Sequence, residues 1–117
     1  MHRQHFDGDA LSVGAARDFV RACLAEAANI EAIVLLVSEL ATNAVIHAGT
    51  SFEVTVVTLG DRIRVTVADS SPDLPARRFA QDTDTGGRGL HLVDALADDW
   101  GVERRDDGKE TWFKVWA

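Results

Sequence analysis

The feature that most constrains the fold is a regular alternation of apolar and polar residues on both sides of a short turn. Residues 51–69 read SFEVTVVTLGDRIRVTVAD, and the alternation runs before and after the turn LGDR. A period of two residues is typical of a β-hairpin that places one face on a core and leaves the other face more polar. The rest of the chain must therefore supply the layer that covers the apolar face.

Two segments with helical periodicity precede this hairpin. Apolar residues recur at helical intervals over residues 13–27, and Ser12 is a candidate N-cap. A second predicted helix follows Asn29, which can cap it, and ends at Gly49, in the way that a C-terminal glycine ends a helix. Because apolar residues occupy most of its circumference, we expect this second helix to be buried on more than one side.

Further elements are predicted at the N-terminus and after the hairpin. Residues 2–6 form a short first strand, and residues 70–88 form a long loop of the kind that often serves as a lid. Residues 89–100 predict a third helix. The chain then closes with two strands, residues 100–105 and 110–117, around the turn DDGK.

The predicted order is therefore β-α-α-β-β-loop-α-β-β. Helices do not alternate regularly with strands, which disfavours a doubly wound parallel sheet. We predict an α+β fold, a two-layer sandwich in which three helices cover one face of a mostly antiparallel sheet. The length of 117 residues fits a single domain over residues 1–117.

Composition restricts the function. The formal net charge is −7 and the isoelectric point is about 4.9, so direct binding to nucleic acid is disfavoured. The sequence contains no apolar run of about 18 residues and no signal-peptide pattern, so we expect a cytoplasmic protein without a membrane contact. Its one cysteine, Cys23, excludes an internal disulfide framework.

Polar residues interrupt the second predicted helix at regular intervals. Glu39, Asn43 and His47 follow one another at i, i+4 and i+8 in the stretch SELATNAVIHA, so a helix places them on one stripe. A carboxamide oxygen is a suitable ligand for Mg²⁺. The stripe is either the wall of a magnesium–nucleotide pocket or an ordinary exposed stripe, and spacing alone leaves both interpretations open.

Two further segments are candidates for nucleotide contacts. In GGRGLHLV, residues 86–93, glycines precede a predicted helix and let backbone amides approach a phosphate. In residues 66–73, Asp69 ends a strand and can accept a hydrogen bond from an amino group such as that of adenine. A flexible loop end and a simple turn aspartate are the alternative interpretations of these segments.

Taken together, these motifs resemble a known family. SELATNAVIHA, the aspartate-led segment 67–75, GGRGLHLVDALADDWG and GKETWFKV follow one another as in the ATP-binding domain of the GHKL (Bergerat-fold, HATPase) superfamily. The resemblance covers about residues 12–116 and is closest to the single-domain anti-sigma factor serine kinases of the RsbW/SpoIIAB type.

The resemblance implies a role for individual residues. Glu39 matches the general base and Asn43 the Mg²⁺ ligand, while His47 matches a position near the pocket without a chemical role. Asp69 matches the aspartate that binds the adenine amino group, and Thr111 the threonine that assists it. On this basis we expect Asp69→Asn to weaken adenine nucleotide binding far more than it disturbs folding.

The resemblance also identifies the ATP lid and one departure from the family. The lid residues that would contact ATP are Gly87, Arg88, Gly89 and Leu90. The aspartate box normally continues with glycines, whereas residues 69–73 here are Asp-Ser-Ser-Pro-Asp. Because serine and proline restrict the backbone, we expect a stiffer loop below the adenine and an effect on ATP affinity.

The implied function is regulation of transcription by partner switching. The protein would bind ATP and Mg²⁺, bind a sigma factor and act as a serine/threonine-protein kinase on an anti-anti-sigma antagonist, with a homodimer as a possible state. One alternative is a catalytically weak ATP-binding interaction module of the same fold. Others are a detached histidine-kinase catalytic domain and an ATPase subunit of the gyrase or chaperone kind.

Overall fold

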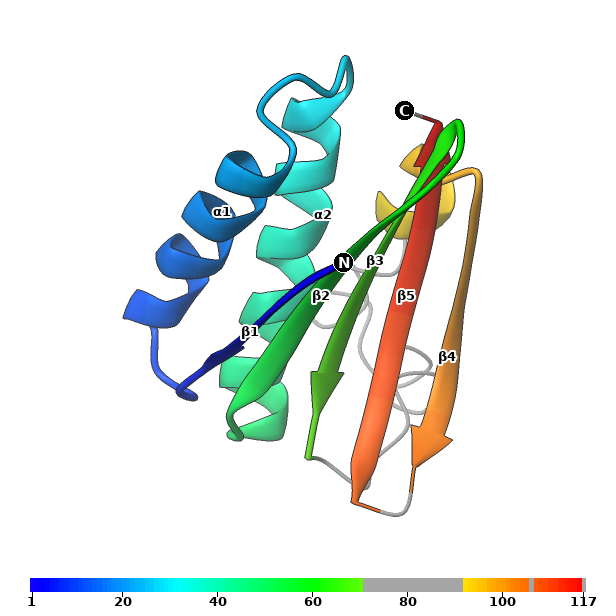
Figure 1. The fold of residues 1–117 in the computed structure, drawn as a ribbon. Helices are drawn as coiled ribbons and strands as arrows, with labels where there is room; N and C mark the ends of the chain where they lie inside the picture. Colours follow the sequence, from blue (N-terminus) through cyan, green and yellow to red (C-terminus); the bar gives the residue numbers. More distant parts are fainter. Residues whose placement is uncertain (71–91, 106, 117) are drawn as a thin grey trace.

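The computed structural model describes residues 1–70, 92–105 and 107–116, and it shows a two-layer domain (Figure 1). The strands are β1 (His2–Phe6), β2 (Phe52–Leu59), β3 (Arg62–Asp69), β4 (Asp99–Arg105) and β5 (Gly108–Trp116). The helices are α1 (Leu11–Cys23), α2 (Ile30–Asn43) and the π-helix η1 (Ala44–Ala48), and residues 92–96 are also helical. None of the helices in these ranges is long and apolar enough to cross a membrane.

The five strands form one sheet in the order β1-β2-β3-β5-β4, and every neighbouring pair is antiparallel. The predicted hairpin is confirmed: Leu59 of β2 pairs with Arg62 of β3 across a two-residue turn. The last strand, β5, lies between β3 and β4 and so holds the two halves of the sheet together. The predicted α+β sandwich with a mostly antiparallel sheet is confirmed.

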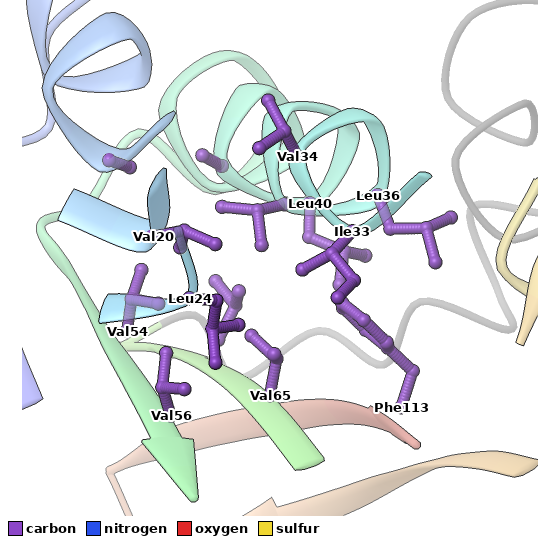
Figure 2. Packing of buried hydrophobic residues seen from close by; sticks show 14 of the residues in the cluster. Val20, Leu24, Ile33, Val34, Leu36, Leu40, Val54, Val56, Val65 and Phe113 are labelled. Carbon is purple, nitrogen blue, oxygen red and sulfur yellow. The ribbon is translucent and has the colours of Figure 1, made fainter. Parts of the chain in front are cut away.

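The core lies between this sheet and the helices. Alternate residues of β2, β3 and β5 are fully buried, among them Val54, Val65 and Phe113. Figure 2 shows Ile33 of α2 beside Phe113 of β5, and Leu36 of α2 belongs to the same core. Burying each large apolar side chain contributes about 1.5–3 kcal/mol, so these contacts fix the helices to one face of the sheet. Val93, in the helical segment 92–96, belongs to the same core, which places that segment on the same face.

The boundaries of α1 differ from the prediction. The helix covers Leu11–Cys23 instead of residues 13–27, and Ser12 lies inside it. Ala10 holds the N-cap position, and the side chain of Asp9 secures the first turn, because its Oδ1 accepts hydrogen bonds from the backbone nitrogen and Oγ of Ser12 at 3.0 and 3.2 Å. Although residues 25–28 have good helix propensity, the chain turns there to bring α2 back along α1, so tertiary packing overrides propensity.

The second helix has the predicted ends but an unexpected final turn. Asn29 holds the N-cap position without a side-chain cap bond; its Nδ2 instead donates to the carbonyl of Trp116 at 2.9 Å and ties α2 to the end of β5. Gly49 ends the helix in the left-handed conformation, with φ of 65°. Between them the α-helix stops at Asn43, and Ala44–Ala48 form a π-turn with i→i+5 bonds.

The third helix is shorter than predicted at its C-terminal end. Helical structure is described for residues 92–96, and β4 opens at Asp99, which we assigned to the helix, and Trp100, which we assigned to both the helix and the strand. The backbone nitrogen of Asp98 donates to the carbonyl of Lys114 at 2.9 Å, so pairing with β5 takes over from the helix at this point. Residues 89–91 lie outside the described residues.

Cations and aromatic rings cover part of the sheet face opposite the helices. The guanidinium of Arg64 lies 4.8 Å from the ring centre of Trp112, and Lys114 Nζ lies 5.5 Å from the same ring. At the end of the sheet, Arg62 lies 4.2 Å from the ring of Trp116. These cation–π contacts explain how large aromatic residues are accommodated on the polar face of the predicted hairpin and its neighbour.

Two glycine substitutions should change stability in opposite directions. A Cβ on Gly108 would overlap the carbonyl oxygen of Asp69, so Gly108→Ala must push β5 away from the end of β3. Gly14 lies inside α1, and a Cβ there would meet only the Arg17 side chain at 3.6 Å. We expect Gly108→Ala to lower the free energy of unfolding by about 1–3 kcal/mol and Gly14→Ala to raise it by about 0.5–1 kcal/mol.

Urea denaturation followed by circular dichroism measures both changes. Gly14→Ala serves as the control, because it makes the same chemical change where the backbone has room for it. A Gly108→Ala protein as stable as the wild type would contradict the close approach of β5 to Asp69.

Candidate functional site

A buried ion pair joins the end of β3 to the start of β5. The Nζ atom of Lys109 lies 3.0 Å from Oδ1 and 2.7 Å from Oδ2 of Asp69. The two side chains are only 6% and 7% exposed. Bringing a charge out of water is costly unless it is paired, so each of these residues depends on the other for its buried position.

Strand register explains why the two charges meet. Asp69 and Lys109 are direct partners in the antiparallel β3–β5 ladder. Asp69 follows Val67 by two residues, and Lys109 precedes Phe113 by four, so both lie on the face that carries the core. Directly opposed residues on one face have Cβ atoms about 4.5–5.5 Å apart, which suits a pair of opposite charge.

The same ladder brings Thr111 close to the pair. Thr111 is 6% exposed and lies opposite Val67, two rungs from the Asp69–Lys109 rung and on the same face. Asp69 and Thr111, which come from sequence positions 42 residues apart, are thus adjacent on the helix-covered face at one end of the sheet. We call this group of three, Asp69, Lys109 and Thr111, the sheet-end cluster.

The acidic and amide residues of α2 lie toward the same end of the molecule. Glu39 and Asn43 are both partly buried and are one turn apart on α2. In Figure 1 the C-terminal half of α2, the end of β3 and the start of β5 are all at the lower end of the domain. Within the described part of the chain the Asn43 side chain makes no hydrogen bond, which leaves its carboxamide oxygen available to a ligand. The backbone of His47 is in the π-turn, so the α-helical spacing that we used for His47 does not apply to it.

The predicted lid residues, Gly87, Arg88, Gly89 and Leu90, lie outside the described residues. Of the altered aspartate box, residues 69–73, the structure describes the first two positions. The backbone nitrogen of Ser70 donates to Oγ1 of Thr50 at 3.3 Å, so the segment after β3 is held against the segment before β2.

A hollow of about 500 Å³ lies at the same end of the sheet, but it does not unite the predicted residues. Side chains of the face opposite the helices line much of it, and the lining includes Asp69 and Lys109 but not Glu39, Asn43 or Thr111. Charged side chains of both signs surround it, Arg3, Glu53, Arg105, Asp107 and Glu110, together with His5. The hollow lies mainly on the face opposite the helices and reaches the Asp69–Lys109 pair, so it does not join Asp69 to Glu39 or Asn43.

Comparison with known families decides the class of the protein. The profile of the histidine kinase-like ATPase domain matches residues 6–115, nearly the whole chain. The chain belongs to the histidine kinase-like ATPase family. The predicted GHKL resemblance is thereby confirmed, and membership of this ATPase family implies ATP binding.

Solved structures agree on the fold. The RsbU and RsbW domains of Rv1364c from Mycobacterium tuberculosis match with a TM-score of 0.74 and 21% identity over 99% of this chain and 32% of that one. The histidine kinase domain of the Erythrobacter litoralis EL346 blue-light activated kinase matches with a TM-score of 0.60 and 20% identity, over 90% of this chain and 59% of that one.

Acinetobacter baumannii histidine kinase AdeS matches with a TM-score of 0.61 and 13% identity, over 99% of this chain and 68% of that one. The chain spans about a third of the length of the Rv1364c structure and about three fifths of the EL346 domain, and at these identities the similarity concerns the fold. A search of curated proteins gave no match.

The described residues of this ATPase domain suit the groups that the family implies. Asn43 offers a carboxamide oxygen with no hydrogen bond to the described residues, the kind of hard ligand that Mg²⁺ accepts beside phosphates and water. Asp69 offers a carboxylate at a fixed position, and Thr111 a hydroxyl nearby. These donors and acceptors are compatible with a magnesium–nucleotide complex.

Sequence reasoning missed Lys109. The signal was present, because Lys109, Thr111 and Phe113 alternate along one strand and Phe113 must face the core. A lysine on that face needs a buried counter-charge. Finding the counter-charge, however, requires the β3–β5 register, which brings together residues 40 positions apart.

The ion pair also changes what we expect of Asp69. Removing one member of a buried pair leaves an uncompensated charge, so Asp69→Asn should disturb folding as well as binding, contrary to the sequence-based expectation. We expect Asp69→Asn and Lys109→Met each to lower the free energy of unfolding, by about 3 kcal/mol. In the double variant the free energy of unfolding should fall by clearly less than the sum of the decreases in the two single variants.

Chemical denaturation of the four proteins in this double-mutant cycle measures the coupling. The ion pair between Arg21 and Glu31 is the matched control, because it is also bidentate, at 3.0 and 2.9 Å, but exposed to water. A cycle on Arg21 and Glu31 should show little coupling, since solvent screens exposed charges. Equal coupling in the two cycles would contradict a special role for burial at Asp69.

Proposed function

We propose that this chain is an ATP-dependent regulator of transcription that binds Mg²⁺ and ATP, binds a sigma factor and phosphorylates a serine of an anti-anti-sigma partner. The supporting observation is that Glu39 and Asn43 lie one turn apart on α2, toward the end of the domain where Asp69 closes β3. That arrangement can surround one nucleotide with three groups. Asp69 would be the hydrogen-bond acceptor for adenine, Asn43 the ligand of the metal ion, and Glu39 the general base for the substrate hydroxyl.

Recognition of the base would rest on the sheet-end cluster. The Asp69 carboxylate would accept a hydrogen bond from the 6-amino group of adenine, and Thr111 would assist on the same face. Because β3 and β5 hold these side chains by backbone pairing, the acceptor needs little rearrangement when the nucleotide binds. Preorganisation of this kind lowers the entropic cost of binding.

The phosphate end would be handled from α2. Asn43 would hold Mg²⁺, which neutralises phosphate charge when bound. Glu39 would take the proton of the partner's serine hydroxyl while the serine oxygen forms a bond to the γ-phosphorus and the bond from that phosphorus to the β–γ bridging oxygen breaks. The products are ADP and a phosphoserine. Most of the rate enhancement in such reactions comes from positioning and charge neutralisation.

The charge of the protein favours a protein partner. With a formal net charge of −7, the chain would be repelled by nucleic acid as a whole and would associate faster with a basic protein surface. A regulator that acts on transcription through a sigma factor, without touching DNA, is consistent with this charge.

Two other candidates have specific support. The serine- and proline-containing sequence of residues 69–73, in place of a glycine-containing box, favours an ATP-dependent binding module without useful transfer. The structural matches to two histidine kinases favour a catalytic domain that phosphorylates histidine. The three candidates differ in whether label is transferred and in the bond that is formed, since phosphoserine survives acid and phosphohistidine does not.

The test of the kinase is transfer of label from γ-labelled ATP to a cognate anti-anti-sigma domain. Glu39→Gln preserves the shape of the side chain but cannot take a proton, so we expect it to bind ATP and partner while transfer falls by about 10²–10⁴-fold. Glu26→Gln is the control, because Glu26 lies exposed in the turn after α1 and should leave transfer unchanged.

Acid-stable label on the partner from wild type and Glu26→Gln, but not from Glu39→Gln, is the predicted result. Acid-labile label would instead identify the histidine kinase. If no protein transfers label while ATP and partner still bind, the binding module is correct and the kinase is not.

A further inference from the structure

Lys109 places a hydrogen-bond donor directly beside the carboxylate of Asp69, which would bind adenine. We propose that Lys109 contacts the base and widens the range of purines that the site accepts, by donating a hydrogen bond to the purine ring nitrogen next to the amino group bound by Asp69. This inference rests on the proposed nucleotide site. It adds a residue that neither the motifs nor the family match assigns.

The hydrogen-bonding capacity of the pair allows this role. An ammonium group has three donors, and two contacts, at 2.7 and 3.0 Å, go to the two oxygens of Asp69. No other acceptor for Nζ lies within the described ranges, so one donor is available to a ligand. A carboxylate offers about four acceptor positions, which is more than the two contacts made by Lys109.

Burial gives the donor its importance. Lys109 is 6% exposed, so a free donor on its ammonium has little water to bind and gains from a ligand acceptor. The pair as a whole is neutral, and an uncharged base can therefore approach it without leaving a lone charge in the interior. Lys114, on the same strand, differs because it lies on the opposite face over Trp112.

The paired donor and acceptor match the edge of adenine. The 6-amino group of adenine is a donor, and ring nitrogens N1 and N7 on either side of it are acceptors. A 6-oxo purine such as hypoxanthine presents an acceptor oxygen beside an N1–H donor, which the same pair can bind with the roles exchanged. Without Lys109, the carboxylate of Asp69 would repel the oxygen of a 6-oxo purine. With Lys109 present, this repulsion is relieved, so Lys109 should lessen the preference for ATP over ITP.

Calorimetric titration of the full chain with ATP, 1-deaza-ATP, 7-deaza-ATP and ITP tests the proposal. For the wild type, we expect one of the two deaza analogues to bind at least about tenfold more weakly than ATP, because a hydrogen bond from a charged donor is lost. In Lys109→Met that difference should disappear. If the weakened analogue is 1-deaza-ATP, the contact is to N1 and the ATP-over-ITP preference should also increase in Lys109→Met. Lys114→Met is the control and should behave as the wild type.

Lys109→Gln, whose neutral carboxamide can still donate to Asp69, replaces Lys109→Met if that variant does not fold. It should show a smaller difference between ATP and the weakened deaza analogue than the wild type, because its donor is uncharged. Two results would contradict the role of Lys109 without contradicting the proposed function. One is a wild type that binds both deaza analogues as tightly as ATP. The other is weaker binding of a deaza analogue to the same extent in the wild type and in the variant at position 109. A wild type that binds none of the nucleotides would overturn the proposed function and this inference together.

Discussion

The ion pair between Asp69 and Lys109 connects the fold to the site. The pair joins two strands and is buried on the helix-covered face. Its acidic member, Asp69, is the residue that the family resemblance assigns to adenine binding. Neither charge could stay in this position without the other. The feature that secures the end of the sheet is therefore the same feature that fixes an acceptor, and a donor beside it, at the candidate nucleotide site.

The surroundings of the pair favour a rigid site. Gly108 lets the backbone of β5 approach the carbonyl of Asp69 more closely than any side chain would permit. The Ser70 nitrogen bonds to Thr50, and Asn29 ties the start of α2 to the last residues of β5. These contacts link segments far apart in the sequence, so the acceptor for the base is held by the whole sheet and not by a local loop.

Local signals predicted most of the fold. The alternation in residues 51–69 was sufficient for the hairpin, and Gly49 was sufficient for the end of the second helix, because each depends on nearby residues only. The errors occurred where distant contacts compete with local preference. The alanine-rich residues 25–28 leave the helix so that α2 can pack, and Asp99 leaves the third helix to pair with β5.

The same division applies to the site. Asp69, Asn43 and Glu39 could be proposed from motifs, whereas Lys109 could not, because its meaning depends on a strand register between residues 40 positions apart. Placing Asp69 and Thr111 two rungs apart likewise required the order of strands, in which β5 inserts between β3 and β4. The roles of Gly87, Arg88, Gly89 and Leu90 remain predictions, since these residues lie outside the described ranges.

The most direct test of this account is a crystal structure of the chain with Mg²⁺ and a non-hydrolysable ATP analogue. The account predicts the adenine amino group within hydrogen-bond distance of the Asp69 carboxylate on the helix-covered face, with the metal ion bound by Asn43. An analogue bound instead in the hollow lined by Arg3, His5 and Arg105, or bound without a contact to Asp69, would contradict it.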